Sequence, residues 1–263
     1  MKNVLFYIFI IFFLVFYSGC LRETDGLTLK KGVLMVGIEI GYPPMEYYDD
    51  NGNPAGFDIS LANAIGEKLD LKIEFIDTAW DGIFAGVDAK RYDCIISSVT
   101  ITPERIINYN VSKPYIQNTL AIVLPRNSRR RVSSPSDLGG LGVAFQEATT
   151  SEYIMADLAK EGLRFTPYAY DKVMYCFDEL RLGRVDAIMT DIVVAYEYLA
   201  RSDFYEIVWQ GGKEEFGIII KKDNNNLFNA VNNAISELLE DGTMLKFSEE
   251  HFNGMDLVSA LKR

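Results

Sequence analysis

The chain has 263 residues, of which 49% are hydrophobic, 13% aromatic and 24% charged, which is the composition of a folded globular protein and not of a disordered one. Its 26 Lys and Arg against 37 Asp and Glu give a formal net charge of −11, so most of its surface repels a phosphate backbone and nucleic-acid binding is excluded. One histidine and three cysteines are too few for a zinc or iron–sulfur site, and we expect no metal and no cofactor.

The first residues of the chain have the anatomy of a secretory signal. Lys2 precedes an apolar run from Val4 to Tyr17, which is too short to span a bilayer comfortably. Ser18-Gly19-Cys20 then resembles a bacterial lipobox, in which the thiol receives diacylglycerol and becomes the mature N-terminus. We therefore expect residues 1–19 to be a lipoprotein signal peptide and Cys20 to be the lipidation site.

Residues 20–27 form a short polar stretch that we expect to act as a tether between the membrane and a folded body. Tyr17 stands where the lipobox usually has Leu, and a signal anchor that is never cleaved is the alternative. Both interpretations place the protein outside the cytoplasm, anchored to the cell membrane.

The first part of the body alternates strands and helices, with a two-proline loop at Pro43-Pro44 ending the first strand. Apolar spacing behind Asp58, which we expect to be the helix cap, predicts the first helix. The predicted strands are Gly32–Ile40, Lys72–Ile76 and Tyr92–Val99, and the predicted helices are Asp58–Leu69, Trp80–Val87 and Pro103–Asn108. This alternation indicates βαβ units and a mostly parallel sheet.

A second series of the same kind begins near Leu138. Its predicted strands are Leu141–Phe145, Arg164–Tyr168 and Ala187–Met189, and its predicted helices are Ser151–Glu161, Lys172–Leu182 and Ile192–Ala200. Extended runs at Leu120–Leu124 and Phe216–Lys221 flank this series, so we expect the chain to cross to a second lobe and return. The last predicted helices, Leu227–Glu240 and Thr243–Glu250, then complete the first lobe.

The sequence therefore predicts an α/β fold with two lobes and two hinge crossings. The predicted lobe one is discontinuous, the predicted lobe two is one segment, and short hinge segments join them. The boundaries are 28–116 and 217–263 for lobe one, 120–211 for lobe two, and 117–119 and 212–216 for the hinge.

Four segments in register carry a family resemblance over nearly the whole body. They are VGIEIGYPPMEYYDDNGNPAGFDISLANAIGEKL, YDCIISSVTITPERIINYNVSKPY, GVAFQEATTSEY and RVDAIMTDIVVAYEY. Together they resemble the family 3 extracellular solute-binding proteins of polar amino-acid ABC transporters. The resemblance implies a periplasmic-binding-protein-like fold of type II that closes on an amino acid between its lobes.

The resemblance also implies partners for the ligand's α-carboxylate. Arg105 matches the arginine that grips this carboxylate in a bidentate fork. Thr149 and Thr150 open a helix where relatives have a glycine-threonine turn, so their N–H groups and hydroxyls are expected to reach the same carboxylate. Ala148 replaces the usual glycine of that turn.

For the α-ammonium, the matching residue is Asp191 at a strand end, assisted by the Ser98 carbonyl and the Thr100 hydroxyl. Strand ends that face a crevice are the expected ligand position in open α/β sheets. A buried zwitterion needs such a partner for each of its charges.

Each assignment has a plainer alternative. The plainer role of Arg105 is a surface ion pair, and the plainer role of Asp191 is to cap the following helix, which is compatible with binding. Thr149 and Thr150 fit an N-cap cluster, Tyr42 a turn and Trp80 a core position.

The ligand's side chain is expected to meet Glu39, Tyr42 and Trp80, with Gln146 adding a neutral hydrogen bond. A carboxylate facing two aromatic planes suits a guanidinium or an ammonium. We therefore favour a basic amino acid, arginine first, with lysine and histidine next. Glutamine and cystine stay open as ligands.

A binding protein that delivers its amino acid to an ABC permease is the favoured function, and we expect a monomer with no catalytic residues. The chain has no GxxxxGK[ST] loop, so ATP hydrolysis by that route is excluded. The alternatives are an enzyme like the cyclohexadienyl dehydratases, which share the architecture, and the sensory domain of a receptor. Incubation with prephenate or arogenate distinguishes the enzyme.

Cys94 and Cys176 fall in different predicted lobes. A disulfide between them would lock the hinge, so we expect both thiols to be free and buried.

Overall fold

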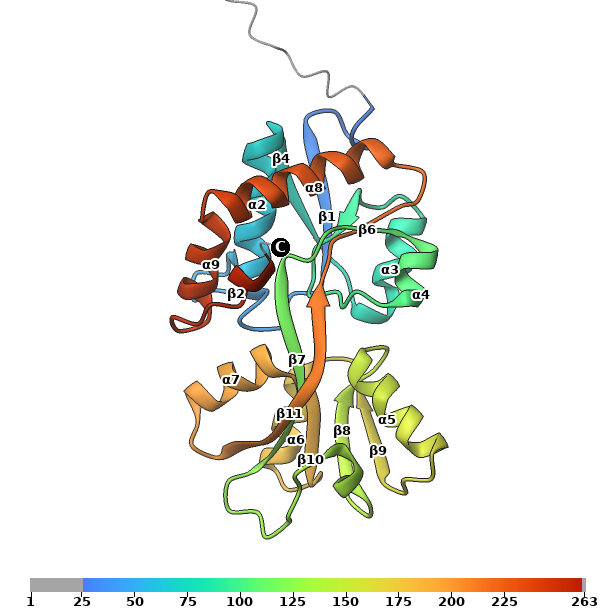
Figure 1. Ribbon diagram of the computed structural model, residues 1–263, viewed down its shortest axis with the longest axis vertical. Coiled ribbons are helices and arrows are strands. Elements are labelled where there is room, and N and C mark those ends of the chain that lie inside the picture. Colours follow the sequence, from blue (N-terminus) through green and yellow to red (C-terminus); the bar gives the residue numbers. More distant parts are fainter. Residues whose placement is uncertain (1–25, 262–263) are drawn as a thin grey trace, which may run out of the picture.

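The structure is a computed structural model that describes residues 26–261. The expected signal peptide, the lipidation site Cys20 and most of the tether lie outside the described residues. Two five-stranded sheets with helices packed on them form two lobes, one above the other in Figure 1. The predicted two-lobed α/β fold is confirmed. Between residues 26 and 261, no helix has both the length and the apolar character needed to cross a membrane.

Lobe one holds the sheet with strand order β4-β1-β5-β12-β6. The first three strands of this order are parallel, and β12 runs antiparallel to both β5 and β6. Its elements are β1 (Val33–Ile38), β2 (Tyr47–Tyr48), β3 (Pro54–Ala55), α2 (Phe57–Leu69), β4 (Lys72–Asp77), α3 (Trp80–Asp88), β5 (Cys94–Ile95), α4 (Pro103–Asn108), β6 (Asn110–Val111), β12 (Ile219–Ile220), α8 (Asn225–Glu240), α9 (Thr243–His251) and the 3-10 turn η2 (Ser259–Leu261).

Two local predictions in lobe one are wrong. The strand predicted over Tyr92–Val99 is reduced to β5, because the chain turns after Ile95 toward the interlobe cavity. The cap of α2 is Gly56, at φ 119°, and not Asp58. A Cβ on Gly56 would lie 2.2 Å from the Met45 carbonyl oxygen, so the close approach of two backbones decides this position. Asp58 points inward and is completely buried.

Lobe two holds the sheet with strand order β11-β7-β10-β8-β9, in which β10, β8 and β9 are parallel. Its other elements follow the predicted order closely. They are η1 (Pro135–Leu138), β8 (Gly142–Gln146), α5 (Thr150–Lys160), β9 (Thr166–Tyr170), α6 (Val173–Arg181), β10 (Ala187–Asp191) and α7 (Ile192–Arg201). Each predicted helix and strand of this series is present. Strands β8 and β10 are buried, whereas β9 is an edge strand of mostly exposed residues.

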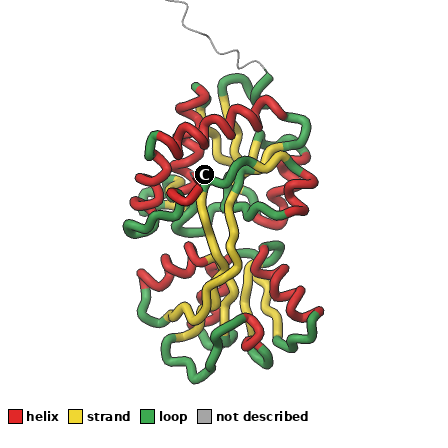
Figure 2. The backbone as a smooth tube through the Cα atoms, in the orientation of Figure 1, coloured by secondary structure: helices red, strands yellow, loops and turns green. Residues whose placement is uncertain are grey.

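Two long strands, β7 (Ile116–Pro125) and β11 (Tyr205–Phe216), pair antiparallel and join the lobes (Figures 1 and 2). The second crossing lies earlier than the predicted run at Phe216–Lys221, because β11 ends where that run begins. The ladder shifts register between Gly211 and Lys213. The predicted hinge segments fall inside these strands, and their action as hinges stays a prediction.

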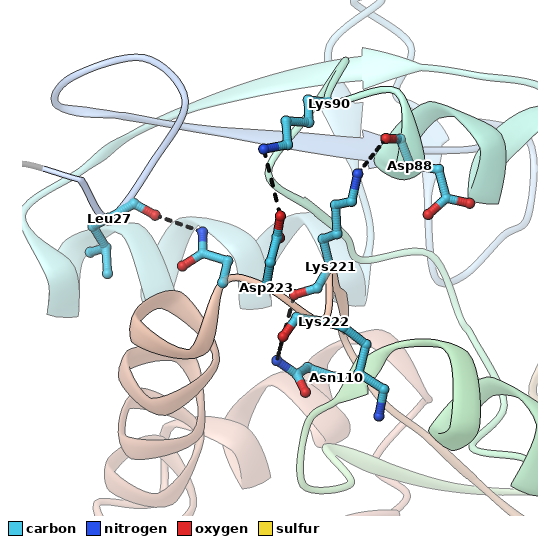
Figure 3. A network of polar contacts seen from close by, with 8 residues as sticks. Leu27, Asp88, Lys90, Asn110, Lys221, Lys222 and Asp223 are labelled. Atoms are coloured by element: carbon cyan, nitrogen blue, oxygen red, sulfur yellow. Dashed lines mark hydrogen bonds and ion pairs between the residues drawn. The ribbon is translucent and has the colours of Figure 1, made fainter.

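The first described residues are attached to lobe one. The Asn224 amide, at the start of α8, donates to the Leu27 carbonyl at 3.0 Å, and the Leu29 N–H donates to Asp93 at 2.6 Å. Around them, the Lys90 ammonium lies 3.6 Å from the Asp223 carboxylate (Figure 3). The start of the body is therefore bonded to lobe one.

Cys94 lies in β5 of lobe one and Cys176 in α6 of lobe two, and both are free and buried, as predicted. Burial raises the pKa of both thiols, which keeps them protonated and unreactive. In a chain carrying Cys20→Ser, we expect thiol titration to find two thiols after denaturation and none in the folded state. Titration of fewer than two thiols in denaturant would contradict the placement of these cysteines in separate lobes.

Candidate ligand-binding site

All ten residues that the sequence analysis proposed for the site line one cavity between the lobes. The full lining is Glu39, Tyr42, Glu46, Trp80, Ser97, Ser98, Thr100, Arg105, Gln146, Thr149, Thr150 and Asp191. Most of these residues follow the carboxyl ends of β1, β5, β8 and β10, where parallel strands open onto a crevice. The sequence did not single out two of them, Glu46 and Ser97.

Arg105 is a buried cation, so its assignment as a surface ion-pair partner is wrong. Only 7% of the residue is exposed, and its guanidinium donates to the Thr100 carbonyl at 2.8 Å. The guanidinium also lies 5.7 Å from the ring centroid of Trp80 and 5.1 Å from that of Phe84. Burial lowers the pKa of Arg105, but a guanidinium stays charged in proteins. Arg105 is therefore held rigidly as the positive group of the cavity wall.

The start of α5 presents backbone N–H groups beside this cation. Thr149 is the N-cap, but its hydroxyl donates to the Gln146 carbonyl at 2.6 Å and makes no cap hydrogen bond to the helix. Ala148, with φ 57°, sits in the left-handed region that glycine favours. Its carbonyl accepts from the Trp80 indole N–H at 3.0 Å. The first turn of α5 is thus open toward the cavity, as anion binding at a helix N-terminus requires.

Asp191 ends β10 and is the N-cap of α7, yet its side chain makes no cap hydrogen bond. One carboxylate oxygen instead accepts from the Tyr42 hydroxyl at 2.5 Å and the other from the Asn118 amide at 2.8 Å. Burial, followed by the charge of Glu214, raises the pKa of Asp191. The capping alternative is wrong for this side chain. The Asp191 carboxylate lines the cavity instead and provides an acidic group at this end of it.

Glu39 lies just beyond β1 and is almost completely buried. Its Oε2 accepts from the Gln146 amide at 2.8 Å, while Oε1 is buried with no hydrogen-bond partner. Burial raises the pKa of Glu39 to about 7, against the hydrogen bond from Gln146 and the charge of Lys172. A buried carboxylate oxygen without a hydrogen-bond partner lowers the stability of the protein. Glu39 is therefore suited to accept a hydrogen bond from a ligand.

Hydrogen bonds between the lobes close the cavity. Tyr42 to Asp191, Gln146 to Glu39 and Trp80 to the Ala148 carbonyl all join a lobe-one group to a lobe-two group. Trp80 also packs edge-on against Phe84, so it belongs to the core as well as to the cavity. An aromatic sandwich of Tyr42 and Trp80 around a ligand stays a prediction.

Two polar residues of the crossing strands were missed by the sequence analysis. The Glu214 carboxylate, on β11, accepts from the Asn118 amide at 3.0 Å and from the Thr100 hydroxyl at 3.3 Å. Asn118, on β7, thereby bridges Glu214 and Asp191. No local pattern reveals these two, because their meeting depends on the register of the β7–β11 ladder.

The charged groups around the cavity indicate which kind of ligand it can bind. One guanidinium and an open helix N-terminus offer a place for a carboxylate, and Asp191 with Glu214 and, separately, Glu39 offer places for cations. Residues 26–261 contain no group of three or more His, Cys, Asp or Glu side chains arranged to hold a metal ion. The arrangement fits noncovalent binding of a small zwitterion with a further donor group.

Comparison with known proteins bears on this interpretation. Residues 34–254 match the family described as bacterial extracellular solute-binding proteins, family 3. The L-cystine-binding protein TcyJ of Escherichia coli (strain K12) is 31% identical over 85% of this chain and 84% of its own. The ABC transporter arginine-binding protein 1 of the same organism is 27% identical over 82% of this chain and 89% of its own.

Solved structures agree on the fold. An ancestral arginine-binding protein bound to arginine is 36% identical, with a TM-score of 0.81 over 84% of this chain and 99% of that one. The ancestral amino acid-binding protein AncCDT-1, described as a precursor of cyclohexadienyl dehydratase, is 35% identical, with a TM-score of 0.78 over 84% and 96% of the two chains. The predicted periplasmic-binding-protein fold of type II is confirmed.

Proposed function

The chain belongs to the bacterial extracellular solute-binding proteins of family 3, and on that premise we propose that it captures an L-amino acid between its lobes and delivers it to an ABC permease. The observation that carries the proposal is that Arg105 and Asp191, of opposite charge and both buried, line one cavity. An amino-acid zwitterion supplies the complementary pair of charges. The relatives named above, which bind cystine and arginine, support the same function.

Arginine is the favoured ligand in this proposal. Glu39 is an acid at the distal end of the cavity, and its unpartnered oxygen lacks only a donor. A guanidinium supplies two parallel N–H donors to a carboxylate and also stacks on aromatic rings such as Trp80. The likeness to an ancestral arginine-binding protein supports this choice.

Cystine is the second candidate, and one contact favours it. Lys172 of lobe two donates to the Ile40 carbonyl at 3.2 Å, and its charge acts on Glu39. A positive and a negative group at the distal end suit a second zwitterion, which cystine carries and arginine does not. The cystine-binding relative supports this alternative.

The remaining parts of the proposal concern the whole chain. Cys20 carries the lipid, residues 20–27 tether a monomer at the outer face of the cell membrane, and lobe two (120–211) swings against lobe one (28–116 and 217–263) about residues 117–119 and 212–216. The long antiparallel pair of β7 and β11, which runs between the two lobes, supports the hinge axis.

A thermal-shift screen of the twenty amino acids and cystine tests the proposed function. A ligand at one hundred times its dissociation constant stabilises the protein by about 2.7 kcal/mol. This corresponds to a rise of about 5–10 °C in the unfolding midpoint for a chain of this size. We expect arginine to give the largest rise; a flat response to all of these ligands would contradict the proposal.

Arginine affinity is also expected to depend on pH. Because burial raises the pKa of Glu39 to about 7, the unliganded site holds a proton there below pH 7 that the guanidinium must displace. Affinity should therefore be about tenfold weaker at pH 6 than at pH 8 from Glu39 alone, and the raised pKa of Asp191 acts in the same direction. Calorimetry across this range, with Glu39→Gln as the comparison, measures the share of Glu39. An equal pH dependence in both proteins would exclude it.

An enzyme on the same fold is the alternative function. Burial raises the pKa of Glu39 to about 7, which suits a general acid in a cleft. The likeness to AncCDT-1 supports a dehydratase as the alternative. That protein is itself described as an amino acid-binding protein. Incubation with prephenate or arogenate decides: release of the aromatic product would replace the transport proposal with catalysis.

A further inference from the structure

Two carboxyl groups, Glu46 in the cavity lining and Asp58 beside it, lie 3.4 Å and 3.3 Å from the same Ser98 hydroxyl. Glu46 is 1% exposed and Asp58 is completely buried. They come from the loop after β1 and the first turn of α2, which the binding proposal leaves without a role. Both contact the loop after β5: the Ser97 hydroxyl donates to Glu46 at 2.8 Å, and the Ser98 N–H donates to Asp58 at 2.7 Å.

The surroundings of this pair contain other acids and hydroxyls. Tyr115 donates to Asp58 Oδ2 at 3.2 Å, and Glu39 and Tyr42 are the other titratable groups whose charge interacts with Glu46. On α9, which packs against α2, His251 is hydrogen-bonded to Ser60 at 2.9 Å. Two adjacent buried carboxylates cannot both stay ionised in such surroundings, because neither charge is compensated.

The hydrogen bonds of the pair leave one carboxylate oxygen without a donor. Asp58 Oδ2 accepts from the Ser98 N–H and from Tyr115 and lies 3.3 Å from the Ser98 hydroxyl, which is also 3.4 Å from Glu46 Oε2. Asp58 Oδ1 is buried with no partner. Glu46 is the side chain that interacts with Asp58 directly, and burial, followed by the charge of Asp58, raises the pKa of Glu46 well above its usual range. A protonated Glu46 is a donor for Asp58, whose Oδ1 has no other hydrogen-bond partner.

We propose that Glu46 and Asp58 share one proton and that this carboxylic acid–carboxylate pair positions the Ser97–Ser98 loop for ligand binding. The role of the loop in ligand binding rests on the proposed function, whereas the shared proton does not. The pair is a positioning unit, since neither acid takes part in the contacts assigned to the zwitterion.

The positioning works through hydrogen bonds of fixed direction. Ser97 Oγ accepts from the Glu39 N–H at 3.0 Å and donates to Glu46, so Glu46 also orients the backbone of the proposed side-chain anchor. Ser98 holds φ 49°, a left-handed conformation uncommon for serine, and Asp58 takes its N–H. The Ser98 carbonyl is thereby left for the cavity, where the sequence analysis assigns it to the ligand's ammonium.

Substitutions of Glu46 separate the shared proton from simple packing. Glu46→Gln keeps a donor for Asp58 and an acceptor for Ser97, so it mimics the protonated acid; Glu46→Ala removes both. With L-arginine as the probe, we expect Glu46→Gln to bind within about threefold of the parent and Glu46→Ala to bind at least tenfold more weakly. The exposed Glu67→Gln, on α2 with Asp58, is the matched control. A folded Glu46→Gln protein that loses as much affinity as Glu46→Ala would overturn the proposal.

Unfolding without any ligand tests the proton directly. The folded parent holds one proton on the pair that the unfolded chain has released above pH 6, so its stability falls as pH rises toward the raised pKa of Glu46. Glu46→Gln has no such proton. Its unfolding midpoint should therefore rise relative to the parent by about 3–5 °C per pH unit between pH 6 and 8, which is one proton or tenfold in the unfolding constant per unit. Glu39 and Asp191 are present in both proteins and cancel.

A difference in midpoint that does not change with pH would overturn the shared proton. If the parent binds none of the screened amino acids, the proposed function fails, while the unfolding comparison still decides whether the pair holds its proton.

Discussion

Arg105→Ala is expected to abolish amino-acid binding while the protein stays folded. The guanidinium is the positive group of a buried cavity and is fixed by the Thr100 carbonyl and two aromatic rings. Without it, the ligand's carboxylate would be buried uncompensated, at a cost of about 3–5 kcal/mol. This is a loss of about two to four decades in affinity.

Calorimetry with the best ligand of the thermal-shift screen measures this loss. Arg184→Ala, which removes an exposed arginine paired with Glu179 on lobe two, is the control and should bind like the parent. The parent's stacking of Arg105 on Trp80 and Phe84 is worth about 0.5–2 kcal/mol, so a small drop in the unfolding midpoint is expected as well. Affinity within a factor of two of the parent would remove Arg105 from the site.

Glu39→Gln is expected to reverse the selectivity of the site. The amide keeps the size of the side chain but removes the charge that compensates a desolvated guanidinium, so arginine should lose about two to four decades in affinity. Glutamine carries no charge on its side chain and should bind equally well or better. In the parent, the Gln146 amide donates to Glu39, and in Glu39→Gln it can donate to the carbonyl oxygen of the new side chain.

Parent and Glu39→Gln are therefore compared against arginine, lysine, glutamine and cystine, with exposed Glu67→Gln as the control for loss of one negative charge. Survival of arginine affinity in Glu39→Gln would show that Glu39 is not the side-chain anchor. If the parent prefers cystine, Glu39 and Lys172 together are the groups that bind the distal part of the ligand.

The family resemblance, and not the local pattern, selected Arg105 and Asp191, because the local pattern alone fits a surface arginine and a helix cap equally well. The structure brings both side chains to one cavity, since Asp191 ends β10 and Arg105 lies in α4, in the segment that follows β5. Residues brought together by long-range register have no local pattern: β11 alternates buried and exposed positions irregularly, and Glu214 within it was missed.

Asp58 shows a different reason for failure. An acidic residue before an apolar helical pattern favours an N-cap, and that rule made Asp58 the predicted cap of α2. In the structure Gly56, which passes close to the Met45 backbone, is the cap, and Asp58 is buried in the first turn of α2. A rule based on neighbouring residues in the sequence does not include contacts with a distant residue such as Glu46.

The attachment of the first described residues to lobe one has a mechanical consequence. Leu27 and Leu29 are bonded to Asn224 and Asp93, all in lobe one, so a restraint applied to the chain ahead of them is transmitted to that lobe. In the proposed anchored protein, lobe one is the fixed frame and lobe two is the body that rotates about the paired strands β7 and β11. A dye on lobe two and a dye in the lipid are then expected to report the proposed rotation, whereas a dye on lobe one and a dye in the lipid are expected to report almost none.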